Sequence, residues 1–148
     1  MPGYIIENVK NGLDIPAHTK EASERDMSSY LEVQAAMKRI YEEDPSHWPY
    51  GLNIPGHDSV YAVKEASTGK VAGFVGWQER TVDGRKVGSY SIGILPEYRG
   101  RGFAKEAVAK VIGEKVAGVD EVVAYVVQGN TASDALAGSL GINVSKEF

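Results

Sequence analysis

Cysteine is absent from this chain of 148 residues, which excludes disulfides, thiolate metal ligands and a cysteine nucleophile. Histidine is scarce, and His18, His47 and His57 are too scattered along the sequence to indicate a metal site. No apolar run approaches the ~20 residues that a membrane-spanning helix needs, and no apolar stretch follows the N-terminus as in a signal peptide. We therefore expect no metal, no membrane association and, by default, a cytoplasmic location.

A strongly basic surface is missing as well. The formal net charge is -4 at pH 7, which argues against general binding to nucleic acids. Apolar residues make up 43% and charged residues 24% of the chain, so disorder is not expected. The length suits one domain with its own core, and no repeat or low-complexity stretch divides it. We interpret residues 1–148 as a single domain.

Hydrophobic periodicity predicts that helices and strands are mixed in this α/β domain. Ser23 with Asp26 can cap a first helix, and Pro45 ends it. Three antiparallel strands should follow, joined by turns at residues 67–70 and 82–85. The expected elements are a strand at 4–9, a helix from about 23 to 43, strands at 59–66, 71–78 and 87–95, a helix at 103–117, a strand at 121–127 and a helix at 131–140.

Several of these elements have patterns that predict their packing. The strand at 121–127 is apolar on both faces, which is typical of a buried central strand. Gly141 is expected to end the last helix as its C-cap. The apolar face of the first helix should contain Met27, Tyr30, Leu31, Met37, Ile40 and Tyr41. The apolar face of the helix at 103–117 should contain Ala104, Ala107, Val108, Val111, Ile112 and Val116.

A glycine-rich segment between the strand at 87–95 and the next helix has the features of an anion site. Such a segment brings several backbone N–H groups and the positive end of the helix dipole to one point. Gly100 and Gly102 let a phosphate approach the backbone without a Cβ in the way, while Arg99 and Arg101 add charge. Taken alone, the two glycines fit a tight strand-to-helix connection equally well.

Other phosphate and nucleic-acid motifs fit this segment less well. Phe103 and Ala104 stand where a Walker loop needs Lys followed by Ser or Thr. The dinucleotide fingerprint requires a parallel βαβ unit, whereas antiparallel hairpins come first here. An Arg-Gly tract that binds nucleic acid would be longer and would lie in a basic, disordered stretch.

The run Arg99-Gly100-Arg101-Gly102-Phe103-Ala104 resembles the Arg/Gln-x-x-Gly-x-Gly/Ala signature of the GNAT superfamily of N-acetyltransferases. Residues 92–98 resemble the family's fourth strand and its exit, and the order of elements is similar to the family over residues 4–142. A later stretch is similar to the family's Asn-x-x-Ala…Leu-Gly-Phe pattern, with Ser and Ile replacing Ala and Phe, at Asn130, Ser133, Leu136, Leu140, Gly141 and Ile142. The resemblance implies a mixed, mostly antiparallel central sheet flanked by helices.

The resemblance also implies how coenzyme A, with acetyl-CoA as the acetyl donor, would bind. In the family the fourth and fifth strands splay apart, and the pantetheine arm pairs in the gap with main chain at Ile92, Gly93 and Ile94. The pyrophosphate would rest on the amides of residues 101–104. A backbone N–H near Ile94 or Leu95 would polarise the thioester carbonyl. Asn130 would lie near the distal pantetheine or the thiol.

Three departures from the family pattern bear on activity. Ala137 stands where many members have a tyrosine that protonates the leaving thiolate. Gly88 and Ser89 stand where other members have a glutamate that takes a proton from the amine. The family's sheet ends with two further strands, but only residues 142–148 follow Gly141, so we expect at least one C-terminal strand to be missing. The chain would then be a fragment, or the edge would be covered by its own folded-back tail or by a second copy in a homodimer.

Candidate catalytic groups in place of the missing ones are Tyr90, Ser91 and Glu79. Alternation along a strand points Tyr90 to one face and the serines to the other, so only one set can face the cleft. Glu79 is the nearest carboxylate by the expected topology. Packing of Tyr90 in the core and a solvated strand end at Glu79 are the competing explanations.

Two segments are candidates for the acceptor side. His47, Trp48 and Tyr50 lie where the family's acceptor-binding loop lies, although an aromatic loop packed on the sheet explains them as well. The acidic residues 42–44 would attract a cationic amine or would simply form a solvated helix end.

Two functions of different class follow from the sequence. The first is an N-acetyltransferase that moves acetyl from acetyl-CoA to a primary amine of a small molecule or peptide, by direct attack in a ternary complex. The second is a catalytically silent GNAT-like module that binds or supports a larger protein. The intact phosphate signature favours the enzyme, whereas the missing acid and base groups favour the silent module.

Overall fold

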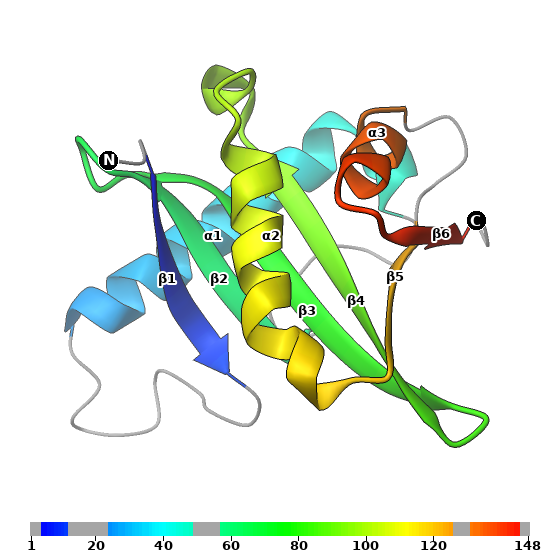
Figure 1. Ribbon diagram of the computed structural model, residues 1–148. Coiled ribbons are helices and arrows are strands. Elements are labelled where there is room, and N and C mark those ends of the chain that lie inside the picture. Colours follow the sequence, from blue (N-terminus) through cyan, green and yellow to red (C-terminus); the bar gives the residue numbers. More distant parts are fainter. Residues whose placement is uncertain (1–3, 12–23, 49–56, 126–130, 146–148) are drawn as a thin grey trace.

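A six-stranded mixed sheet, in the order β1-β2-β3-β4-β5-β6, forms the middle of the protein (Figure 1). The computed structural model describes residues 4–11, 24–48, 57–125 and 131–145. Strands β1 to β4 pair antiparallel, whereas β4 with β5 and β5 with β6 pair parallel. The elements are β1 (Tyr4–Asn11), α1 (Glu24–Glu43), η1 (Pro45–His47), β2 (Ser59–Glu65), β3 (Val71–Val82), β4 (Arg85–Ile94), η3 (Pro96–Tyr98), α2 (Phe103–Lys115), η4 (Val116–Gly118), β5 (Glu121–Tyr125), α3 (Thr131–Ser139) and β6 (Asn143–Ser145).

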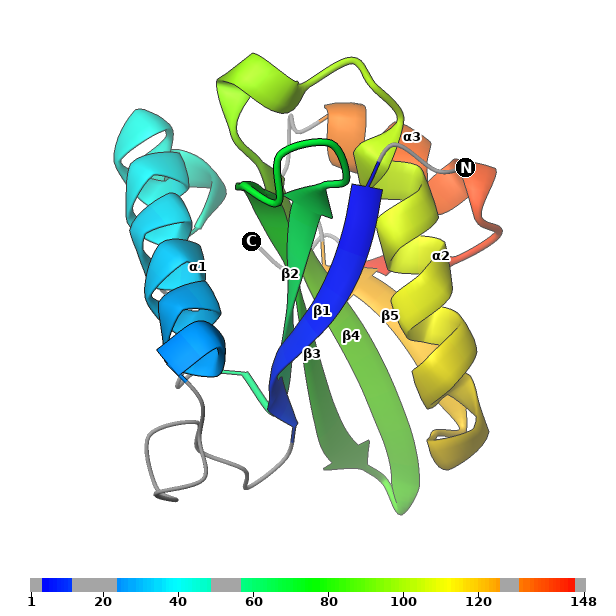
Figure 2. The same ribbon diagram turned by 90° about the vertical axis from the view of Figure 1, so that its left-hand side faces the viewer.

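Helices cover both faces of this sheet, which confirms the predicted fold class. Figure 2 shows the sheet between α1 on one face and α2 on the other. Residues of α1 pack with Phe74 of β3 in one apolar cluster, and residues of α2 pack with Trp77 of the same strand in a second cluster. α3 lies on the α2 side, where Leu136 and Leu140 pack against that second cluster.

The predicted strands are confirmed in kind and order, and β3 extends furthest beyond its predicted end. β3 reaches Val82 rather than residue 78, because its pairing with β4 continues down to Val82 and Arg85 beside the turn. Asp83 (φ 52°) and Gly84 (φ 77°) form that turn. Two consecutive residues with positive φ are the requirement of a tight hairpin whose twist matches the strands, and the Asp-Gly pair meets it.

Two predicted core positions were wrong. Val116 was assigned to the apolar face of the helix at 103–117, but α2 ends at Lys115 and Val116 is 48% exposed in η4. Leu31 of α1 is 53% exposed, because the buried stripe of the helix passes through Val33, Ala36, Met37 and Ile40. Both residues fit the helical spacing, but each lies beyond the edge of the surface that the sheet covers.

β4 and β5 pair over only a short stretch. Their register joins Val87 to Glu121, Gly88 to Val122 and Ser89 to Val123, and within the described strands it goes no further. From there β4 continues to Ile94, and Figure 1 shows β5 diverging from it. The parallel pair therefore opens towards the end of β4 that leads into α2.

The tail of the chain returns to the sheet. β6 pairs parallel with β5, with Val123 opposite Asn143 and Tyr125 opposite Ser145. This confirms the prediction that the tail folds back as a short strand on the open side of β5. One strand follows α3 in the described residues, and β5 has a neighbour on each side without a second copy of the chain.

Glycines on β4 and α2 allow a matched test of packing. A Cβ at Gly88 would lie 2.2 Å from the Trp77 ring, whereas a Cβ at Gly113 would meet nothing within 4 Å among the described residues. We expect Gly88→Ala to lower the free energy of unfolding by about 1–3 kcal/mol through overpacking. Gly113→Ala should raise it by about 0.5–1 kcal/mol through helix propensity. Urea denaturation measures both; equal effects would contradict the packing described for Trp77.

Candidate functional site

The N-terminus of α2 is built from two glycines in the left-handed backbone region. Gly100 has φ 81°, and Gly102, the N-cap of α2, has φ 77°. Residues with a Cβ rarely adopt these angles, which explains the glycines. A Cβ at either position would meet no atom of the described residues within 4 Å, so the backbone faces open space. The first N–H groups of α2, which have no helical acceptors, point where an anion can bind.

Both arginines of this segment, Arg99 and Arg101, form ion pairs with carboxylates. Arg99 donates from Nε to the carbonyl of Ile94 (3.0 Å) and from Nη1 to Oε1 of Glu43 (2.8 Å). Arg101 donates from Nη1 to Oε2 of Glu65 at 2.5 Å. The two arginine side chains are still 50% and 48% exposed. Their charge is therefore partly neutralised, and the glycine backbone remains the better candidate for binding an anion.

Hydrogen-bond geometry directs alternate backbone groups of β4 towards the opening beside β5. The N–H of Leu95 donates to the carbonyl of Ala72 on β3 (2.8 Å). Hydrogen-bonded and non-hydrogen-bonded pairs alternate along an antiparallel ladder, so Gly93 and Ser91 also direct their backbone groups to β3. The intervening residues direct theirs away from β3; these are Tyr90, Ile92 and Ile94.

These backbone groups lie beyond Ser89, the last residue of β4 that pairs with β5 in the described part of the chain. An extended ligand can therefore bind them as an added strand. The predicted donor to a thioester carbonyl was Ile94 or Leu95. Leu95 already donates to Ala72, so the prediction narrows to Ile94.

Tyr90 projects from β4 on the α2 side, at the start of the opening. Its ring packs against both the α2 cluster and a small cluster formed by Ala124 of β5 and Ala137 of α3. Its hydroxyl is buried and has no hydrogen-bond partner among the described residues. Burial raises the pKa of Tyr90 from the ordinary 10.0 to about 12. This small cluster includes Ala137, the position where the family resemblance placed a catalytic tyrosine.

Ser91 projects to the opposite face and is joined to a histidine that the sequence analysis had set aside. The face follows from Gly93 two residues on, where a Cβ would meet Phe74 and Ile40 on the α1 side. Nε2 of His57 lies 3.2 Å from Oγ of Ser91. The two residues are 34 positions apart, so no local spacing links them. The weak sequence signal was a histidine placed just before a strand rich in buried residues.

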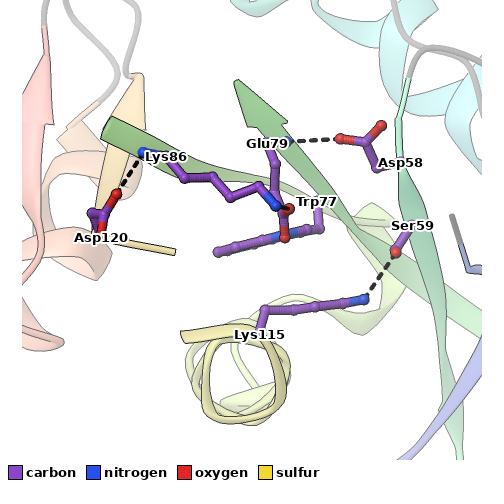
Figure 3. A network of polar contacts seen from close by, with 7 residues as sticks. All are labelled: Asp58, Ser59, Trp77, Glu79, Lys86, Lys115 and Asp120. Atoms are coloured by element: carbon purple, nitrogen blue, oxygen red, sulfur yellow. Dashed lines mark hydrogen bonds and ion pairs between the residues drawn. The ribbon is translucent and has the colours of Figure 1, made fainter. Parts of the chain in front are cut away.

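Glu79 does not lie with the other two candidates. As Figure 3 shows, its carboxylate faces Trp77 and Lys86 near the hairpin end of the sheet. It accepts a hydrogen bond from Nε1 of Trp77 (2.8 Å) and lies 3.4 Å from Nζ of Lys86. Glu79 pairs with Gly88, six residues before Ile94, or about 20 Å along the strand. A structural role in satisfying the buried indole explains it better than proton transfer in the opening.

Several predicted residues lie outside what the structure describes. Asn130 and Tyr50 fall outside the described residues, and the His47 side chain is not described. Trp48 packs on the sheet, with its ring centroid 6.0 Å from that of Phe74. Glu43 pairs with Arg99, as described above.

Two general findings concern the described part of the chain. No helix in it is long and apolar enough to cross a membrane. No group of three or more histidine, aspartate or glutamate side chains in it is arranged to hold a metal ion.

Comparison with known proteins identifies the family. Residues 13–143 match the family model described as an acetyltransferase (GNAT) domain, so the chain belongs to the GNAT acetyltransferase family. No protein with a curated description matches the chain.

Solved structures of acetyltransferases share the fold. The N-acetyltransferase of Staphylococcus aureus Mu50 is similar with a TM-score of 0.65 and 16% identity, over 93% of this chain and 82% of that one. The ribosomal-protein-alanine N-acetyltransferase of Brucella melitensis biovar Abortus 2308 has a TM-score of 0.63 and 12% identity, over 99% and 94%. The aminoglycoside acetyltransferase meta-AAC0020 from an uncultured soil sample has a TM-score of 0.60 and 11% identity, over 99% and 92%. At these identities the likeness concerns the fold alone.

The buried Tyr90 hydroxyl, which has no hydrogen-bond partner among the described residues, allows a prediction about the free energy of unfolding. We expect Tyr90→Phe to keep the ring packing and raise the free energy of unfolding by about 1 kcal/mol, since it removes a buried unsatisfied group. Because burial raises the pKa of Tyr90 from the ordinary 10.0 to about 12, its titration does not affect stability below pH 10 and lowers the free energy of unfolding as pH rises from 10 through 12.

Denaturation at pH 8 and at pH 11 separates these two effects. The variant should be stabilised at pH 8 and should lose less stability than the parent between the two pH values. Tyr61, whose pKa burial also raises to about 12, is unchanged and supplies the remaining alkaline sensitivity. A variant less stable at pH 8 would mean that the hydroxyl is hydrogen-bonded.

Proposed function

We propose that the protein is an N-acetyltransferase that uses acetyl-CoA to acetylate a primary amine in a ternary complex. The observation that carries the proposal is the opening between β4 and β5, which starts after Ser89 and leads to the glycine-capped N-terminus of α2. The free edge of β4, which can pair with an extended ligand, thus leads directly to the candidate anion site at the N-terminus of α2. Acetyl-CoA has the matching shape, an extended amide-containing arm attached to a pyrophosphate, and it supplies an activated acetyl thioester.

The chain's own groups would divide the binding between them. The N–H groups at the start of α2, from residues 101–104, hold the phosphates, with Arg99 and Arg101 adding partial charge. Backbone groups of Ile92 and Ile94 hold the amides of the arm. The N–H of Ile94 is the donor on the open side of β4 for the carbonyl oxygen that gains negative charge. Asn130 remains a predicted contact.

Tyr90 is the proposed acid. Its hydroxyl is buried, and Tyr90 directly follows Ser89, the last residue of β4 that pairs with β5 in the described strands. A pKa of about 12 keeps the hydroxyl protonated across the physiological range, so it can donate a proton to the departing sulfur. Because the ring packs against the cluster that includes Ala137, a tyrosine from β4 would serve where the family uses one from the last helix.

The acceptor is proposed to be a small-molecule or peptide amine. The structural neighbours named above include enzymes for ribosomal-protein alanine and for aminoglycosides, which makes both classes suitable first substrates. A cytoplasmic location remains a prediction.

Replacement of Gly102 tests the proposed phosphate site, with Gly84 as a matched control. Both residues have φ 77° and neither Cβ would meet an atom of the described residues within 4 Å, so valine causes similar backbone strain at each. We expect Gly102→Val to weaken acetyl-CoA binding by at least about 100-fold, since a side chain would occupy the phosphate's place. Gly84→Val, in the β3–β4 turn, should bind normally. Calorimetry decides, and equal affinities in the two variants would remove the basis of the site.

Activity is expected to depend on the Tyr90 hydroxyl. Two acceptors are tested: an aminoglycoside, and a peptide whose first residue is alanine. A thiol reagent measures the coenzyme A that is released, because the protein has no cysteine that could react with it. Tyr90→Phe should lower kcat by about 10²-fold and leave acetyl-CoA affinity unchanged. The parent rate should show no decline from tyrosine ionisation below about pH 11, given the pKa of about 12. An unchanged kcat in the variant would rule out Tyr90 as the acid.

A further inference from the structure

His57 is a buried side chain that the reaction outlined above does not use. It is 8% exposed and lies edge-on to Phe74, with ring centroids 6.4 Å apart. Its Nε2 lies 3.2 Å from Oγ of Ser91, on the α1 face of β4. Imidazole is the side chain that most often accepts protons in catalysis near neutral pH. A buried imidazole joined to a hydroxyl beside the opening is therefore a candidate for proton transfer.

The surrounding structure holds this imidazole in place. A Cβ at Gly76 would lie 2.4 Å from the His57 ring, so the ring rests directly on the backbone of β3. The next residue, Asp58, is fixed at two points. Its N–H donates to the carbonyl of Trp77 (2.9 Å). Its Oδ2 accepts from the N–H of Glu79 (2.7 Å), the bond between these two residues that Figure 3 shows. Asp58 is thereby anchored to β3, and the neighbouring His57 is held with it.

Ser91 connects this imidazole to the proposed reaction point. It lies between Tyr90 and Ile92, whose backbone groups face the opening, and two residues beyond Ser89, where pairing with β5 ends. The Tyr90 side chain lies on the α2 face and the Ser91 side chain on the α1 face. A thioester held at this end of β4 would therefore have the buried phenol on one side and the serine–histidine pair on the other.

We propose that Ser91 and His57 form a proton relay for the acceptor amine, which approaches from the α1 face. The inference rests on the proposed function, and it assigns the general base that the acetyl transfer requires. The amine nitrogen forms a bond to the acetyl carbon, the carbon–sulfur bond breaks, and its electron pair leaves with the sulfur. The proton that the nitrogen loses passes to Oγ of Ser91, while the Ser91 hydroxyl proton passes to Nε2 of His57. Ser91 touches the amine, and His57 is the final proton acceptor.

The absence of cysteine gives a test that needs no acceptor. Ser91→Cys introduces the single thiol of the protein, beside His57. Ser89→Cys is the matched control, on the same face of β4 but two residues towards the closed end. A thiol next to an imidazole ionises more readily, so the Ser91→Cys thiol should react with iodoacetamide at pH 7 roughly tenfold faster than in the double variant with His57→Gln. The Ser89→Cys thiol should not respond to His57→Gln.

A coenzyme A derivative then tests whether the pair faces the proposed ligand. Bromoacetyl-CoA should alkylate Ser91→Cys with one adduct, located by mass spectrometry, and excess coenzyme A should protect the thiol. Ser89→Cys should react slowly. If calorimetry shows that the protein binds coenzyme A but the two variants react equally, the pair lies away from the reaction point and the inference is wrong.

Transfer to an amine completes the test. In the otherwise unchanged protein, His57→Gln and Ser91→Ala should each lower kcat by about 10²–10⁴-fold and flatten the rise of rate with pH, whereas Ser89→Ala should not. Acetyl-CoA affinity should be unchanged in all three variants. Normal transfer and an unchanged pH profile in His57→Gln would overturn the relay while leaving the acetyltransferase assignment intact. Failure of the parent to bind acetyl-CoA would instead overturn the proposed function.

Discussion

Within the described strands, parallel pairing between β4 and β5 covers three residue pairs, and the arrangement of the candidate site depends on this short ladder. If the ladder continued, the backbone groups of Ile92 and Ile94 would bond to β5 and no ligand could use them. β5 pairs with β6 from Val123 onward, which satisfies those of its backbone groups that point away from β4. The Tyr90 ring packs against the cluster of Ala124 and Ala137 beside the opening. In the described strands, the part of β4 beyond Ser89 therefore has β3 as its paired neighbour, which leaves its other edge for a ligand.

Elements with strong local signals could be predicted from the sequence. The Asp83-Gly84 turn and the glycines that begin α2 require positive φ, a demand that very few residue types meet. The resemblance to acetyltransferases rested on the same glycine segment, and the family match agrees with it. The opening between β4 and β5 was an implication of that resemblance, because nothing in the local pattern of either strand marks where their pairing ends.

Long-range contacts could not be predicted in the same way. His57 and Ser91 meet because β2, β3 and β4 align in register, and a change of one residue in either pairing would separate them. Glu79 looked like a free carboxylate in sequence, yet the buried Trp77 indole needs an acceptor and takes it. The N–H of Leu95 was a predicted donor to the ligand, yet the β3 ladder engages it at Ala72. In each case a hydrogen bond across the sheet decided the outcome.

The close contact between His57 and Gly76 has a consequence for how the sequence can vary. Any side chain at position 76 would occupy the space of the imidazole, since a Cβ there lies 2.4 Å from the ring. A larger residue at 76 becomes compatible with the fold only when a smaller residue stands at 57. The two positions are therefore epistatic, and neither is free to drift on its own. In a library that varies both positions, folded variants would have a large side chain at position 57 or at position 76, but not at both. A histidine at position 57 would be found together with glycine at position 76, since only glycine leaves room for the ring.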